Sequence, residues 1–429
     1  MQPCPGTGSY PQTFFPGLAS LLRQLPDPRH QSYITYPAPV LLMTRILSSL
    51  CYISSMRKTS EEFNSEQMIA NIWTLCGEAD AGNELPYWET MNRYLKRLKP
   101  ACLQKVQTQL VRHLLRSRAF EAARVRGRYW QILIDGTQLY RSRNSLDERS
   151  LYCIHNKGTA NEYRENYYYV LEAKLVLHSG MIVSLLSEFV ENEEGGEAEK
   201  QDCERKACWR LMERLKEEFP RLPICLSADS LYACKGWFQR CEQSHWKYIL
   251  RFKEGSIPSI GEEYQSLKGC QKNRRENKED GWWYDFVTGV EYEGNKLQVL
   301  EYEPKRASKE APAFLFLTNL PLQHTNAQET AELGRRRWKM ENEGFNTQKR
   351  QGYNLEHPYS KDYEALKNHY YLIQIGHMIA QILEGWESLW KGIRQSLEQK
   401  HRRILESLKQ SPLKGHMQEL ERRVQIRFG

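Results

Sequence analysis

Two short apolar segments, almost a hundred residues apart, both run directly into an aspartate. Residues 130–135 read WQILID and residues 222–229 read LPICLSAD. Apolar runs of this length, bounded by turn-forming residues, are typical of buried strands. We therefore predict two buried strands that end at Asp135 and Asp229, which restricts the chain to folds built around a sheet.

The patterns around these two segments predict a mixed α/β sheet. Two runs at 167–177 and 181–190 form a predicted hairpin, and the later strands alternate with helices. Apolar residues spaced by three and four positions predict helices on both sides of this region. Further predicted strands are 247–252 and 312–320, and predicted helices include 203–219, 327–350 and about 362–390.

These patterns divide the chain into four parts. We predict a helical N-terminal region at 1–126, a core at 127–254 and 311–360, a β-rich insertion at 255–310, and a helical C-terminal region at 361–429. The N-terminal helices are rich in Lys and Arg, which suits DNA binding, although a solvated helical face explains them equally well.

Composition narrows the class of protein further. The 429 residues are 40% hydrophobic and 11% aromatic, which indicates a globular chain, and no apolar run is long enough to predict a membrane span. The eleven cysteines show no CxxC spacing, so we expect reduced thiols in a cytoplasmic protein and no zinc site. The formal net charge of +8 supports a polyanionic partner only weakly.

Each strand-ending aspartate has an ordinary explanation of its own. Asp135 precedes Gly136, and Asp-Gly is a common turn dipeptide. Asp229 precedes a predicted helix and can serve as its N-cap. Two aspartates at equivalent strand ends can also meet on one edge of a sheet, and that possibility favours a joint catalytic role.

A third carboxylate is expected from the helix at 327–350, where Glu341 and Glu343 compete. On a regular helix, Glu341 shares a narrow stripe with Arg337, Phe345 and Gln348. Glu343 lies nearly opposite, on a face that looks charged and solvated. We choose Glu341, while a plain surface glutamate remains the ordinary explanation for it.

Three carboxylates that converge need cations to neutralise them. Hard divalent ions with oxygen ligands satisfy this need, and Mg²⁺ is the default choice. Two such ions, about 3.5–4 Å apart, activate an attacking hydroxyl and stabilise the leaving oxygen at a phosphodiester. The predicted triad is therefore suited to phosphoryl transfer.

Four segments together resemble the DDE-type transposases of bacterial insertion sequences. They are LIDGTQ at 133–138, SADSLYA at 227–233, YILRFKEGS at 248–256 and RRRWKMENEGFNTQK at 335–349. In particular, the chain is similar to the cut-and-paste group with a β-rich insertion before the catalytic Glu, over about 40–390. This resemblance implies a ribonuclease-H-like core in which Asp135, Asp229 and Glu341 are catalytic metal ligands.

The signature of that group around its Glu is Tyr, two residues, Arg, three residues, Glu, six residues, Lys. Arg337 and Glu341 match it, but Gly334 stands at the Tyr position. Lys349 lies one residue beyond the expected Lys position, which holds Gln348. The resemblance implies phosphate contacts for Arg337 and Lys349.

Two adjacent tryptophans in the insertion, Trp282 and Trp283, are candidates to stack on a DNA base at the element's end. Such stacking contributes about 1–3 kcal/mol per base. Packing within the small predicted sheet is the ordinary explanation for at least one of them.

The sequence therefore predicts a DNA transposase that acts at terminal inverted repeats. Water attacks first, and the freed 3′ hydroxyl then attacks a second phosphodiester; the family implies excision through a hairpin. Expected cofactors are two Mg²⁺ ions, with Mn²⁺ as a substitute. Expected partners are double-stranded DNA and a second copy of the chain, in the cytoplasm of a bacterium on its nucleoid, with no membrane. The alternatives are a nuclease or resolvase without strand transfer, and an inactive DNA-binding descendant.

Overall fold

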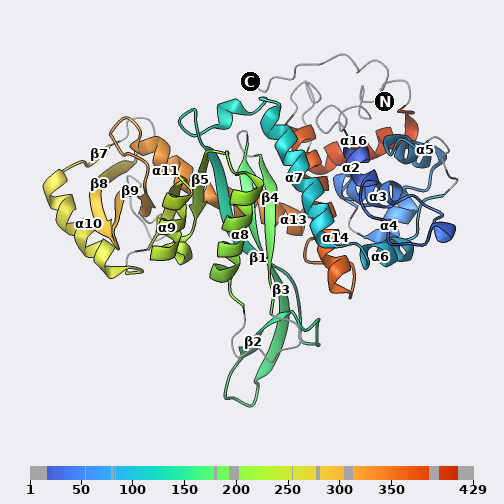
Figure 1. The fold of residues 1–429 in the computed structure, drawn as a ribbon, viewed down its shortest axis with the longest axis horizontal. Coiled ribbons are helices and arrows are strands. Elements are labelled where there is room, and N and C mark those ends of the chain that lie inside the picture. The colour runs from blue at the N-terminus through green and yellow to red at the C-terminus, as the bar shows by residue number, and fades with distance from the viewer. Residues whose placement is uncertain are drawn as a thin grey trace.

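One ten-stranded sheet runs through the molecule (Figure 1). The computed structural model describes residues 17–53, 55–78, 82, 84–177, 181–192, 202–253, 255–276, 281–303, 313–385 and 396–413. The strand order is β2-β3-β1-β5-β6-β10-β9-β8-β7, and β4 pairs with β3. The strands are β1 (Trp130–Ser142), β2 (Leu151–His155), β3 (Tyr163–Val176), β4 (Ile182–Val190), β5 (Ile224–Ala228), β6 (Lys247–Phe252), β7 (Arg275–Glu276), β8 (Trp283–Tyr292), β9 (Asn295–Glu303) and β10 (Phe314–Thr318).

Five strands form the centre of the fold in the order β4-β3-β1-β5-β6. The strands β3 and β4 pair antiparallel, as the predicted hairpin requires, and β1 pairs antiparallel with β3 on its other side. From β1 onward the pairing becomes parallel, through β5 to β6. Three antiparallel strands followed by two parallel ones confirm the predicted ribonuclease-H-like mixed α/β fold.

Strands from the predicted insertion extend this same sheet. Strand β10 pairs with β6 on one side and with β9 on the other, which joins β7, β8 and β9 to the centre. Helix α10 (Pro258–Gln271) precedes these strands and was not predicted. It is anchored by Tyr264, which donates a 2.6 Å hydrogen bond to Glu301 on β9, and by Lys268, which pairs with the same carboxylate.

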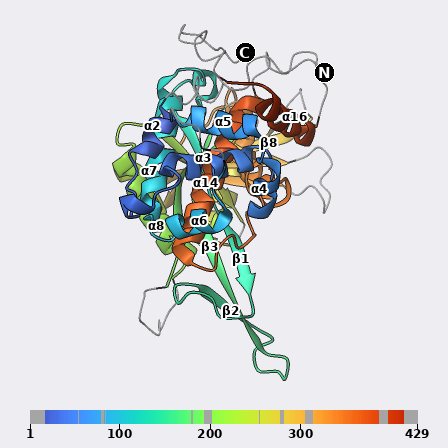
Figure 2. The same ribbon diagram turned by 90° about the vertical axis from the view of Figure 1, so that its right-hand side faces the viewer.

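Two predictions about strands are wrong. Strand β1 does not end at Asp135 but continues to Ser142, because β3 is long enough to pair with it over that length. Strand β2 was not predicted; with the ends of β1 and β3 it forms a ribbon that projects from the molecule (Figures 1 and 2). The turn of the predicted hairpin, residues 178–180, lies outside the described residues.

Helices of the N-terminal region pack against α14 (Tyr363–Glu384), a nearly wholly buried helix (Figure 2). Arg45 of this region is buried there and donates hydrogen bonds to Ser48 and Ser49, at 2.8 and 2.7 Å. Helix α14 ends before the predicted position 390, and residues 386–395 lie outside the described part. The remaining helices here are α2 (Leu18–Arg23), α3 (Ala38–Leu50), α4 (Met56–Glu62), α5 (Glu66–Leu75), α6 (Trp88–Leu95), α7 (Pro100–Arg116) and α16 (Leu397–Gln410).

The two faces of the central strands carry different helices. Helix α8 (Glu204–Glu218) covers one face, where Tyr169 of β3 reaches Glu204. A continuous helical segment crosses the other face, where Met340 and Phe345 pack on Leu133 of β1. This segment consists of α11 (Ala327–Arg335), α12 (Arg337–Lys339), the π-helical turn η4 (Met340–Asn346) and α13 (Thr347–Arg350). No helix in the described part is long and apolar enough to span a membrane.

Candidate active site

The register between β1 and β5 brings the two predicted aspartates level with each other. Leu133 pairs with Ser227 in this parallel ladder, and two further residues along each strand lead to Asp135 and Asp229. Level residues on parallel neighbours point to the same face of a sheet. Asp229 follows the last residue of β5 and also caps the next 3-10 turn by accepting a 2.7 Å hydrogen bond from Leu231 N–H.

Asp135 has a strongly perturbed environment. It is inside a paired strand, opposite Glu172, which excludes the Asp-Gly turn as the reason for its presence. Its Oδ2 accepts a 2.6 Å hydrogen bond from Arg337 Nη1, and its Oδ1 lies 3.0 Å from Gly136 N. Burial raises the pKa of Asp135 to about 6, against the lowering effects of Arg337 and Gly136, and the charges of Glu204 and Asp229 add to the rise.

We expect the metal-free protein to lose stability relative to its Asp135→Asn variant as the pH rises from about 4 to about 6. The folded-state pKa of about 6 exceeds the ordinary value of 3.8, so the folded protein binds this proton more tightly than the unfolded chain does. The stabilisation is complete below the ordinary pKa and is lost as the pH passes the folded-state pKa. The change should be on the order of 2 kcal/mol. Urea unfolding in EDTA at several pH values measures it, and a pH-independent difference between the two proteins contradicts it.

A third carboxylate near the aspartates, Glu204, was not singled out from the sequence. It begins α8 and accepts a 2.9 Å hydrogen bond from Tyr169 and another from Tyr232. Tyr169 has room because Gly136 lacks a side chain; a Cβ there would lie 2.4 Å from the Tyr169 hydroxyl oxygen. Nothing in the local sequence distinguishes Glu204 from other first-turn glutamates, so only the fold reveals it.

Glu341 is exposed, and Glu343 is partly buried with its Oε2 shielded from solvent and without a hydrogen-bond partner. The expectation that Glu343 lies on the more solvated face does not match this burial, because Glu341 is the more exposed of the two. The choice of Glu341 as a metal ligand stays a prediction. Glu341 nevertheless follows Arg337 by about one helical turn, and Arg337 contacts Asp135. Glu343 lies instead 3.5 Å from Lys339.

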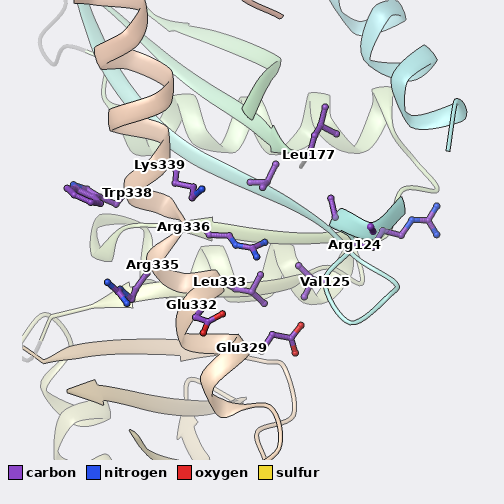
Figure 3. Close-up of a pocket in the computed structure, with 13 residues that line it drawn as sticks. Arg124, Val125, Leu177, Glu329, Glu332, Leu333, Arg335, Arg336, Trp338 and Lys339 are labelled. Carbon is purple, nitrogen blue, oxygen red and sulfur yellow. The ribbon is translucent and has the colours of Figure 1, made fainter. Parts of the chain in front are cut away.

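The Lys339 side of the helix faces a separate pocket of about 640 Å³. Figure 3 shows Arg336 and Lys339 directed toward Val125 and Leu177 across this pocket, with Arg335 and Trp338 on the opposite side of the helix. Of the two glutamates, Glu341 thus lies on the same side of the helix as the Asp135 contact.

The π-helical turn η4 accounts for the displaced lysine of the signature. A π turn accommodates one residue more than an α turn, so Lys349, eight residues after Glu341, takes the direction that the seventh residue has on a regular helix. Gln348, at the nominal position, is fully buried and lies 2.7 Å from Gln374 and 2.9 Å from His377. The sequence carries a weak signal for this turn, since Asn and Gly have low helix propensity and alternate through NEGFN.

The departure at the Tyr position also has a structural cause. A Cβ on Gly334 would lie 2.5 Å from the ring of Phe316, a residue of β10. The Phe316 ring therefore fills the space beside this helix, and only glycine fits at 334.

The two tryptophans of the insertion are both engaged within the protein. Trp282 stacks on Tyr302 with ring centroids 4.7 Å apart, and the Arg335 guanidinium lies 4.8 Å from its ring. Trp283 is half-buried in β8, with Arg274 at 5.2 Å. Trp338, next to Arg337, is 66% exposed.

The paired aspartates offer the hard oxygen donors that Mg²⁺ prefers. Burial is the main cause of the raised pKa of Asp135, and the charges of Glu204 and Asp229 add to it. A bound cation would stabilise the ionised carboxylates against these effects. In the part of the chain that the structure describes, no group of three or more His, Cys, Asp or Glu side chains is arranged to hold a metal ion. Asp135 and Asp229 thus lie level on neighbouring strands, and Glu341 does not complete a three-residue group with them in the described structure.

Comparisons with known proteins found a matching family model and similar solved structures. The family model described as "Transposase DDE domain" matches residues 127–379, more than half of the chain. A cryo-EM structure of a piggyBac transposase synaptic complex with hairpin DNA is similar with a TM-score of 0.43 and 11% identity, over 96% of this chain and 81% of that chain. No curated protein matches the sequence significantly.

Proposed function

This chain belongs to the transposase DDE domain family, and on that premise we propose that it cleaves and joins DNA strands at the terminal inverted repeats of an insertion sequence. The proposed reaction is metal-dependent and of the cut-and-paste type. The observation that carries this proposal is the alignment of Asp135 and Asp229 on neighbouring parallel strands, with Arg337 from a distant helix bonded to Asp135.

The metal ligands we propose are Asp135, Asp229 and Glu341. When bound, one or two Mg²⁺ ions neutralise charge at the phosphodiester and lower the pKa of the attacking hydroxyl. The exposure of Glu341 supports this role, since a ligand that completes a site together with DNA has to face the solvent-filled side. Glu343 is the weaker candidate because it pairs with Lys339 on the pocket side of the helix.

The cations of the helix would orient the DNA. Arg337 is held at Asp135 by a 2.6 Å contact, so its remaining N–H groups lie next to the reacting phosphate. Lys349 pairs with Glu356 at 2.8 Å. The π turn gives Lys349 the direction that the signature lysine has on a regular helix. We propose that hydrolysis first frees a 3′ hydroxyl and leaves a 5′ phosphate, and that this hydroxyl then displaces a second 3′ oxygen at the target.

The DNA partner requires further surfaces. We propose that the N-terminal helices hold the terminal repeats, with the insertion contributing Trp282 and Trp283 at the element's end. Because two ends must be brought together before joining, we propose a homodimer in the DNA complex.

The purified chain should cut a duplex that carries the inverted repeat found beside its gene, and should join the cut end to plasmid DNA, only when Mg²⁺ or Mn²⁺ is present. Gel analysis of labelled duplex measures both steps, and EDTA provides the control. Cutting without joining identifies a nuclease or resolvase. Binding without cutting identifies an inactive descendant, and either result overturns the proposal.

A further inference from the structure

The row of side chains that contains the two aspartates continues onto β6. Ala228 pairs with Leu250 in the parallel ladder of β5 and β6. The residues that follow them, Asp229 and Arg251, are therefore level with each other. Arg251 also pairs with Phe316 of β10, whose ring packs under Gly334. Arg251 is therefore the neighbour of Asp229 on the face that the α11–α13 segment crosses.

The protein satisfies only part of the hydrogen-bonding capacity of the Arg251 guanidinium. Its guanidinium lies 4.4 Å from the ring centroid of Phe314, and Nη2 donates a 3.2 Å hydrogen bond to the carbonyl of Ala313. Nη1 is shielded from solvent and has no hydrogen-bond partner in the described part of the chain, and no carboxylate there forms an ion pair with Arg251. A shielded, unpaired donor on a charged group is unfavourable until an acceptor reaches it.

Two further arginines lie close to Arg251. We call Arg251, Arg335 and Arg337 the arginine cluster. Arg335 lies 5.7 Å from the Phe314 ring, on which Arg251 also stacks. The charge of Arg337 acts on Arg251 and, after burial, lowers its pKa. Asp135 is the one carboxylate paired with a member of the cluster in the described residues. The cluster thus carries an excess of positive charge directly beside the aspartates.

We propose that Arg251, together with Arg337, forms a phosphate-binding subsite beside Asp229 that holds a DNA backbone phosphate next to the scissile bond. This inference rests on the proposed function and adds to it a residue outside the signature of the helix. A phosphate is suited to the place because a guanidinium offers two parallel donors to its oxygens. The rings of Phe314 and Phe316 hold the guanidinium in orientation, and its Nη1 has no hydrogen-bond acceptor within the described part of the protein.

Arg251 also has an ordinary explanation, which is packing on two aromatic rings, and Arg240 is a matched control for it. The Arg240 guanidinium lies 4.5 Å from the Trp209 ring, and its Nη1 donates to the Gly236 carbonyl at 3.4 Å. Arg240 thus has the same kind of stack and the same kind of backbone bond, but on α9 (Lys235–Gln243), which covers a different surface.

The test compares Arg251→Gln, Arg251→Lys and Arg240→Gln in the full chain. Binding to a 40-base-pair duplex with the terminal repeat is measured in EDTA over a range of salt concentrations, so that no cleavage occurs. Each lost phosphate contact reduces the slope of log K against log salt by about 0.9. We expect Arg251→Gln to show this smaller slope and about tenfold weaker binding at low salt, and Arg251→Lys to recover the slope. Arg240→Gln should behave as the wild type.

Equal slopes for Arg251→Gln and Arg240→Gln overturn the inference, even if the wild type cuts and joins DNA. The converse result separates the two proposals: if the wild type fails to cut, but Arg251→Gln alone lowers the slope, the subsite stands and the transposase reaction does not. Thermal unfolding checks that each variant is folded. If Arg251→Gln is unfolded, Arg251→Lys decides instead, because it keeps the charge. A folded Arg251→Lys protein whose slope of log K against log salt is smaller than that of the wild type also overturns the inference.

Discussion

Replacing Asp135 by Asn should abolish DNA cleavage while leaving binding to the element's ends intact. Asn keeps the size and can still accept the Arg337 hydrogen bond, but it removes the negative charge that a divalent ion requires. We expect a loss of roughly 1,000-fold or more in the cleavage rate, since the metal supplies several kcal/mol of transition-state stabilisation. Asp229→Asn should behave in the same way, because the two side chains lie level on adjacent strands.

Asp147 offers a matched control for this experiment. Its carboxylate is also partly buried and paired with an arginine, 2.8 Å from Arg149, but it lies outside the site. Asp147→Asn should therefore cleave at close to the wild-type rate once its folding is verified. Cleavage by Asp135→Asn at that same rate contradicts our assignment of the active site.

Replacing Lys174 by Met should destabilise the fold by about 3–5 kcal/mol, because it leaves a buried carboxylate without its counter-charge. Lys174 and Glu172 are both fully buried, with Nζ 2.5 Å from Oε2, and Tyr370 donates a further hydrogen bond to Glu172. The pair also lies against the helical segment with Glu341, since a Cβ on Gly344 would lie 3.4 Å from the Lys174 side chain. Urea or thermal unfolding measures the loss.

The double variant Glu172→Gln with Lys174→Met should recover much of this stability, since no unpaired charge then remains buried. Lys235→Met provides the surface control, because its ion pair with Glu293 is half exposed and screened by solvent. It should leave the unfolding midpoint unchanged. If Lys174→Met is as stable as Lys235→Met, the buried pair does not support the fold.

The sequence pattern predicted the central strands well, because buried strands are short apolar runs that local residues reveal. The prediction failed where strands far apart in the sequence pair with each other. The continuation of β1 past Asp135 depends on β3, and the ribbon strand β2 depends on the same partner. A local Asp-Gly signal for a turn was overridden by these ladder hydrogen bonds.

The helix with Glu341 shows a second kind of limit. Its assignment to a face assumed a constant 100° per residue, and the π turn changes that angle between Met340 and Asn346. The matches at Arg337 and Glu341 precede most of the turn and keep their spacing, while the Lys349 match is displaced by one residue. The exposed position of Glu341 and the partly buried position of Glu343 follow from the same change.

The residues alone were enough to single out the side chains that we propose for the chemistry, since a carboxylate after a buried strand and an Arg-x-x-x-Glu spacing are local features. The meeting of Asp135 with Arg337, the approach of Glu204, and the place of Arg251 beside Asp229 became visible only in the folded chain. The reason is physical: strand register and helix crossing bring together residues that are far apart in sequence, and no local preference encodes that contact.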